Sequence, residues 1–150
     1  MNLSVLVPAV LAYTRQKGGY ATKTKLLKLL YLLDIEEYRA NHSTLTGFDW
    51  VFHKYGPWAQ QYDAVLADLQ AVGKIVLRAE SRPELDTVFV DASVPISLSE
   101  AFPRFVDELR ARRIIEAWAD RPVNSWITCI STRSRCGKRG GESRWISRVY

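Results

Sequence analysis

Few residues in this 150-residue chain could carry out catalysis. A metal site or a nucleophile–base pair needs partners that converge on the two histidines, His42 and His53, and the sequence shows no such pattern. Asp34, Glu36 and Glu37 could act as paired carboxylates, but at the end of a leucine-rich helix they are more simply a solvated face. Glycine-rich phosphate loops and nucleophile-elbow motifs are missing. We therefore expect a protein that is not an enzyme and uses no metal and no cofactor.

A second group of residues suits binding rather than catalysis. Five aromatic side chains crowd around a Gly-Pro turn, and Trp and Tyr are common anchors of protein interfaces. The same residue types also pack cores, and for Trp50 and Tyr62 core packing is the main alternative. Tyr55 and Trp58, on either side of the turn, are expected to be partly exposed. The candidate partner-binding residues are Trp50, Lys54, Tyr55, Pro57, Trp58 and Tyr62.

Helices dominate the elements that must position these residues. Apolar spacing predicts a first helix over Asn2 to Lys17, capped by Asn2 and ended by a Gly-Gly pair. A second helix, over Lys23 to Ala40, follows the N-cap residue Thr22 and is apolar nearly all round, which is typical of a helix buried by its neighbours. A third helix is expected to open at Pro57 or Trp58. Its inward residues would be Tyr62, Val65, Leu66 and Leu69.

Strand signals are fewer and shorter. The segment Phe48 to His53 alternates like a short strand, while Lys74 to Ala79 and Leu85 to Asp91 predict a hairpin. The expected fold class is therefore α+β but predominantly α-helical. It would be a compact helical domain with a buried Leu-rich helix and one small β-hairpin.

The apolar residues of the last predicted helix fall on two opposite sides. Ser97 or Ser99 is expected to cap it, and its first apolar face would hold Phe102, Phe105, Val106 and Leu109. Ile114, Ile115 and Trp118 fall on the opposite side at 100° per residue. Either the helix breaks near Arg110–Arg113, or different neighbours bury it on two faces.

The net charge of +5 belongs to the C-terminal end of the chain. Residues 1–120 carry 14 Lys and Arg against 15 Asp and Glu, whereas residues 121–150 carry seven against one. From Asn124 onward the sequence also loses its apolar period, and the two cysteines there match no metal pattern. We expect a domain over residues 1–123 and an atypical basic tail over residues 124–150. That tail is either disordered or, on our preferred hypothesis, a frameshifted translation.

Two motifs at a definite separation carry a family resemblance. Lys25 to Leu32 looks like the opening helix of the Panacea domain, the SocA-like antitoxin family of prokaryotes and phages. About twenty-five residues later, Lys54-Tyr55-Gly56-Pro57 is similar to the turn of that family. The resemblance covers residues 1–78 well and the next forty residues loosely.

The resemblance implies an antitoxin that neutralises a protein toxin by direct contact. One branch of the family is similar to a proteolytic adaptor that hands its toxin to a ClpXP-type protease. No apolar run is long enough to cross a bilayer, so we expect a cytoplasmic protein without a membrane partner. A winged-helix DNA-binding regulator stays open as the alternative. Its only basic cluster in the domain is Lys23, Lys25 and Lys28, which could equally be the wet stripe of the second helix.

Overall fold

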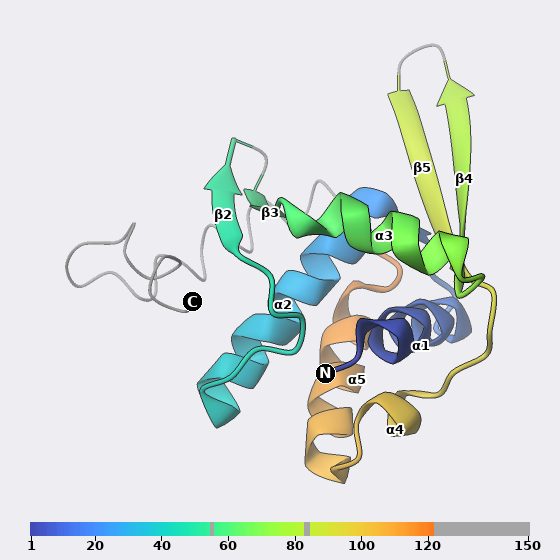
Figure 1. The fold of residues 1–150 in the computed structure, drawn as a ribbon. Helices are drawn as coiled ribbons and strands as arrows, with labels where there is room; N and C mark the ends of the chain where they lie inside the picture. Colours follow the sequence, from blue (N-terminus) through green and yellow to red (C-terminus); the bar gives the residue numbers. More distant parts are fainter. Residues whose placement is uncertain (55, 83–84, 122–150) are drawn as a thin grey trace.

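The computed structural model describes residues 1–54, 56–82 and 85–121. The described residues form the helices and strands α1 (Leu3–Gln16), β1 (Ala21–Thr22), α2 (Lys23–Asn41), β2 (Trp50–His53), β3 (Gly56–Ala59), α3 (Gln61–Ala71), β4 (Ile75–Arg82), β5 (Leu85–Ala92), α4 (Leu98–Ala101) and α5 (Phe105–Trp118). Strands β1, β5 and β4 form one antiparallel sheet in that order, and β2 and β3 form a second. Helix α3 lies between the two sheets, with β3 at one end and β4 at the other (Figure 1).

Local signals set both ends of α1. The Asn2 side chain accepts a hydrogen bond from a backbone N–H of the first turn, as an N-cap residue does. At the other end Gly18 adopts a φ of +77° and donates to the carbonyl of Arg15, while Gly19 donates to the carbonyl of Thr14. These two bonds are a Schellman motif, whose left-handed position favours glycine. The predicted ends of the first helix are confirmed.

Helix α2 is the centre of the domain. Thr22 caps it by accepting from the backbone N–H of Lys25, and every residue from Lys25 to Asp34 is buried. The helix packs against α5, β1, β3 and β5, so neighbours cover it on several sides. The prediction of a buried, leucine-rich second helix is confirmed.

The alternative that Lys23, Lys25 and Lys28 form a solvent-exposed stripe on α2 is wrong for two of the three lysines. Lys25 and Lys28 are buried. The Lys25 ammonium donates to the carbonyl of Ala119, just past α5, where a helix end leaves carbonyls without intrahelical partners. Because phosphate contacts need exposed cations, this burial weakens the DNA-binding alternative.

The predicted fold class is also wrong in its emphasis. The α+β class holds, but the described residues contain two antiparallel sheets rather than one small hairpin, so the domain is mixed rather than predominantly helical. The second sheet was missed because Gly56 to Ala59 was expected to turn directly into a helix. Instead this segment is extended and pairs with β2, and α3 begins at Gln61. The fixed φ of Pro57 suits an edge strand as well as a first helical turn.

The chain breaks its last helix at a different place from either expectation. Ser97 and Glu100 form the capping box of the short helix α4, which confirms Ser97 as a cap. Phe102 is buried beyond α4, and α5 starts afresh at Phe105. The inward residues of α5 are Glu108, Ala111, Ile115 and Trp118. The apolar face predicted for this helix is wrong, because Phe105, Val106 and Leu109 are exposed.

The basic segment over residues 124–150 lies outside the described residues, as do its cysteines. The domain limit at residue 123 and the frameshift hypothesis therefore stay predictions. Sequencing the coding DNA tests the second: we expect a single-base slip near codon 124. An intact frame through Tyr150 would contradict it and would make the basic tail a real part of the protein.

Candidate partner-binding surface

The β2–β3 hairpin presents an exposed apolar face. In the antiparallel ladder Val51 lies opposite Trp58, and residues opposite each other share a face. The exposed fractions are 43% for Val51 and 38% for Trp58. His53 is on the same face, and its ring meets the Trp58 ring edge-on at 5.2 Å between centroids. We call Val51, His53 and Trp58 the hairpin surface.

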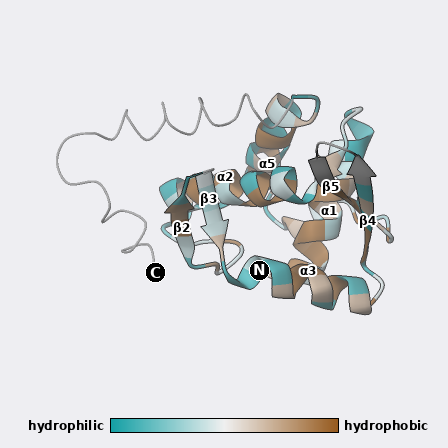
Figure 2. Cartoon of the chain, turned by 90° about the horizontal axis from the view of Figure 1, so that it is seen from above, coloured by the Kyte–Doolittle hydropathy of each residue, from teal (hydrophilic) through white to brown (hydrophobic). Residues whose placement is uncertain are grey.

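The opposite face of the hairpin packs on α2. Trp50 is buried, and its ring centroid lies 5.2 Å from that of Tyr31 on α2. Phe52, further along β2, approaches the same tyrosine at 6.3 Å but stays 47% exposed. Figures 1 and 2 show the hairpin at the side of the domain, away from α1 and from the β4–β5 sheet. The hairpin surface is thus held by an aromatic base and faces outward.

A buried carboxylate fixes the segment that leads into β2. Asp34 accepts from the backbone N–H of Leu45 at 2.8 Å, from that of Thr46 at 3.0 Å and from the indole N–H of Trp50 at 2.8 Å. The Thr46 hydroxyl donates to it as well. Burial raises the pKa of the Asp34 carboxyl, and the hydrogen bonds from Thr46, Trp50 and Leu45 oppose that rise.

The expectation that Asp34 belongs to a solvated face is therefore wrong. Both of its oxygens are taken up by donors of its own chain, which is the arrangement of a structural anchor rather than of a general base. A buried aspartate inside a helix gives no periodic signal, so sequence spacing could not have found this role.

The two resemblance motifs meet in space. Gly56, in the second motif, lies over Lys28, in the first: a Cβ built on Gly56 would be 3.9 Å from the Lys28 Cε. Gly56 has a φ of +112°, a conformation that favours glycine. The motifs are therefore one structural unit, the contact between the start of α2 and the tip of the hairpin.

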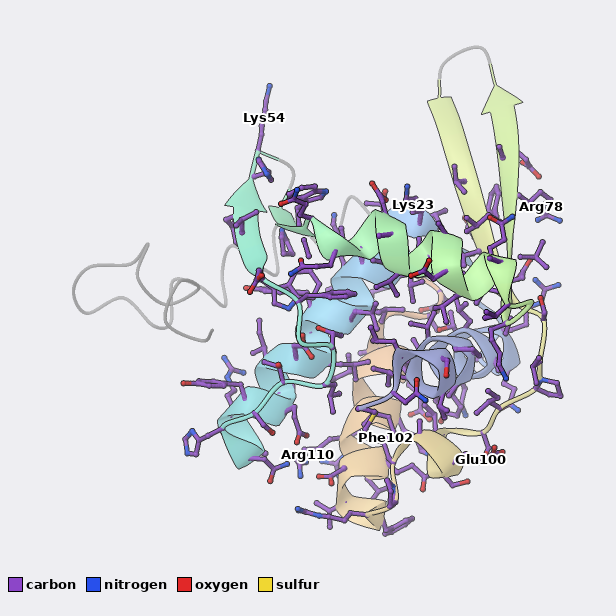
Figure 3. The ribbon with its side chains drawn as sticks, viewed as in Figure 1. Lys23, Lys54, Arg78, Glu100, Phe102 and Arg110 are labelled. Atoms are coloured by element: carbon purple, nitrogen blue, oxygen red, sulfur yellow. The ribbon has the colours of Figure 1, made fainter. Side chains whose placement is uncertain are left out.

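The structure separates the six candidate residues. Trp50, Pro57 and Tyr62 are buried, and the Tyr62 hydroxyl donates to the carbonyl of Lys23 at 2.6 Å. Trp58 and Lys54 are exposed, and Lys54 projects from the tip of the hairpin (Figure 3). Tyr55 lies outside the described residues. The three buried residues could only hold a partner-binding surface in place. Trp58 and Lys54 could contact a partner directly.

Sequence reasoning missed two members of the hairpin surface, Val51 and His53. The alternation of β2 was visible, but which face would point outward depends on where α2 lies. A second exposed apolar group, Phe105, Val106 and Leu109 on the outer side of α5, was also missed.

The described residues form a mixed α+β domain in which one face of the β2–β3 hairpin is exposed and apolar and the other packs on aromatic side chains. Among the described residues no three His, Cys, Asp or Glu side chains gather closely enough to hold a metal ion. Over the same residues, no helix combines the length and the hydrophobicity needed to span a bilayer.

A comparison with known protein families gives a match to part of the chain. Residues 26–89 match the family model of the antitoxin SocA-like, Panacea domain, which confirms the resemblance seen in the sequence. The matched segment runs from α2 to β5 and contains the whole β2–β3 hairpin. Residues 26–89 are thus similar to an antitoxin-like domain. Searches of curated proteins and of solved structures gave no match.

Proposed function

We propose that this protein is the antitoxin of a toxin–antitoxin pair and that it neutralises a protein toxin by direct binding through the hairpin surface. The observation that carries the proposal is the exposed Val51–Trp58 pair inside the antitoxin-like segment. Aromatic side chains that are half-exposed on a rigid base lose little conformational freedom on binding, which makes them effective anchors. The family makes a toxin the expected occupant of that surface.

The toxin can be found by expression. Each reading frame that flanks the coding sequence is expressed alone and together with this protein in a bacterial host. We expect one frame to stop growth alone and to be tolerated in the presence of this protein. If this protein restores growth against neither flanking product, the antitoxin proposal is contradicted.

Trp58→Ala should weaken toxin binding about 30-fold, because loss of an interface anchor costs about 2 kcal/mol. Trp58 is outward-facing, so the midpoint of thermal unfolding should change little. Titration calorimetry with the purified toxin gives the affinity, and circular dichroism gives the unfolding midpoint.

A matched control is Val72→Ala, at the far end of α3. Val72 is at least as exposed as Trp58, but it lies outside the hairpin. It should leave the affinity unchanged. Equal losses for the two variants would show that the hairpin surface is not the toxin site, and unfolding by Trp58→Ala would place Trp58 in the core.

Delivery of the toxin to a ClpXP-type protease is the finer form of the proposal. It predicts that the half-life of the toxin falls when this protein is expressed and recovers in a host without that protease. A toxin that is neutralised but equally long-lived in both hosts would mean inhibition by binding alone. The expected location for either activity is the cytoplasm.

A further inference from the structure

Strand β4 is the outer edge of the three-stranded sheet. Within the part of the chain that the structure describes, it pairs with β5 and with no other strand. It pairs with β5 one to one and without a bulge over its whole length, whereas natural edge strands are usually shortened, bulged, charged or covered. Figures 1 and 2 both show β5 between β4 and α2, so β4 lies on the outer side of the hairpin. Such a regular edge is a template for a further strand.

The register of β4 and β5 shows which backbone groups face this edge. The Ser93 N–H donates to the Lys74 carbonyl, in line with the register, so the even-numbered residues of β4 are the ones that bond to β5. The odd-numbered residues Leu77 and Ala79 therefore direct their N–H and C=O groups away from β5. A second extended strand can bond to these groups without disturbing the existing sheet.

The outer half of the β4–β5 hairpin has few neighbours. Strand β1 pairs only with Phe89 and Val90, so from Val88 to the end of β5 the described ladder is two-stranded. Figure 1 shows this part of β4 and β5 extending past the helices. A two-stranded ribbon is marginally stable by itself, whereas sheets of three or more strands are stable. A further strand on β4 would therefore stabilise this half of the hairpin.

The exposed face of β4 carries two opposite charges. Arg78 and Glu80 have side-chain exposed fractions of 60% and 41%, and their charged atoms approach to 3.9 Å. The Arg78 guanidinium lies 5.4 Å from the ring centroid of Phe89, its partner on β5, and this contact restricts its position at the edge (Figure 3). A single charge would repel a second copy of the strand. A positive and a negative residue on one face instead complement the same two residues on a strand that runs in the opposite direction.

We propose that β4 pairs antiparallel with β4 of a second copy of this chain, with Ala79 on the two-fold axis. In this register Arg78 of each copy lies opposite Glu80 of the other, and the outward backbone groups of Leu77 and Ala79 meet outward groups of the second strand. A two-fold axis at Arg78 would place like charges opposite each other. The two three-stranded sheets would join into one continuous sheet through an isologous contact.

This register also keeps the two domains apart. Val76 of one copy lies opposite Arg82 of the other, so the two Val76 residues are about 20 Å apart along the sheet. The helices lie at the Ile75 end of β4, which places the two helical parts on opposite sides of the axis. The β2–β3 hairpin lies away from β4, and both hairpin surfaces stay accessible in the dimer. The inference therefore does not depend on the proposed toxin site.

Analytical ultracentrifugation of the full-length chain tests the proposal. We expect a concentration-dependent dimer between about 1 µM and about 1 mM. Glu80→Arg brings like charges together at two symmetric positions and should weaken dimerisation about tenfold or more. The double variant Arg78→Glu with Glu80→Arg restores opposite charges across the axis and should recover most of the dimer. A chain that is monomeric over this whole range, or a double variant as weak as Glu80→Arg, would overturn the proposal.

A cysteine at Ala79 tests the position of the axis. The two residues on the axis form a hydrogen-bonded pair with Cα atoms about 5.5 Å apart, which suits a disulfide. In a background with Cys129→Ser and Cys136→Ser, oxidised Ala79→Cys should form a covalent dimer. Val76→Cys is the matched control, because Val76 is exposed on the same strand but far from its own copy. Equal cross-linking of the two variants would show that the register is wrong.

Two further variants separate this dimer from the proposed toxin site. Because the Ala79 N–H points away from β5, Ala79→Pro removes a bond to the second copy and none within the sheet. It should abolish the dimer and leave the affinity for the toxin unchanged. Trp58→Ala should leave the dimer intact. Loss of the dimer in Trp58→Ala, or a dimer unaffected by Ala79→Pro, would overturn the pairing at β4, whereas an intact dimer that binds no toxin would contradict the proposed function alone.

Discussion

Asp34→Ala should lower the free energy of unfolding by about 3 kcal/mol, because it leaves three buried N–H groups without an acceptor. Two of them, from Leu45 and Thr46, hold the segment that precedes β2, and the third is the indole N–H of Trp50. Urea unfolding followed by circular dichroism measures the change. We expect the midpoint to fall without a large change in the slope, since the compactness of the denatured state is unaffected.

Asp34→Asn is the matched control for that variant. An asparagine of nearly the same shape keeps one acceptor oxygen, but its amide group faces donors that need an acceptor. Its loss of stability should be smaller than that of Asp34→Ala and still measurable. If neither variant shifts the urea midpoint, the Asp34 hydrogen bonds do not hold the β2 segment, and the hairpin must be positioned by its aromatic base alone.

The consequence of this anchor for binding is direct. Because Asp34 holds Trp50 and the chain before it, Asp34→Ala should also weaken toxin binding, although Asp34 itself is buried. The loss of toxin affinity should be caused by unfolding of the hairpin and not by the loss of a direct contact with the toxin. A temperature low enough to keep the variant folded should therefore restore part of the affinity.

The second large effect concerns Gly19, where α1 and the end of α5 touch. A Cβ on Gly19 would lie 2.7 Å from the carbonyl carbon of Ala119 and closer still to its oxygen. These are backbone atoms and cannot rotate away, and the same oxygen accepts from the Lys25 ammonium. Gly19→Ala should therefore cost about 3 kcal/mol by overpacking, measured by the same urea unfolding.

Gly18→Ala separates this close contact from ordinary glycine effects. A Cβ on Gly18 would meet no atom within 4 Å, so only its φ of +77° is unfavourable. We expect a loss of about 1 kcal/mol there, the usual cost of a left-handed residue other than glycine. Equal losses at the two positions would mean that the contact between Gly19 and Ala119 can relax.

Features that depend on near neighbours in the chain were determined by the sequence itself. Asn2 and Gly18 end α1, Thr22 caps α2, and Ser97 caps α4, each through bonds to residues a few positions away. The burial of α2 was also determined in this way, because a helix without a polar face has no side that favours water. The two family motifs could also be recognised from the sequence, because each is a run of neighbouring residues.

The tertiary structure alone decided where the charged and aromatic residues went. Lys25 is buried against Ala119, Lys28 lies under Gly56, and Asp34 accepts from the chain before β2. Each of these three contacts joins two segments that are distant in the sequence. The sequence pattern of either segment would be the same if the two had packed against other neighbours. Similarly, Phe105 and Ile115 have the same hydrophobic character, but only one of them faces a neighbour. A period shows that a helix has an apolar side, whereas contacts between residues distant in sequence decide which side is covered.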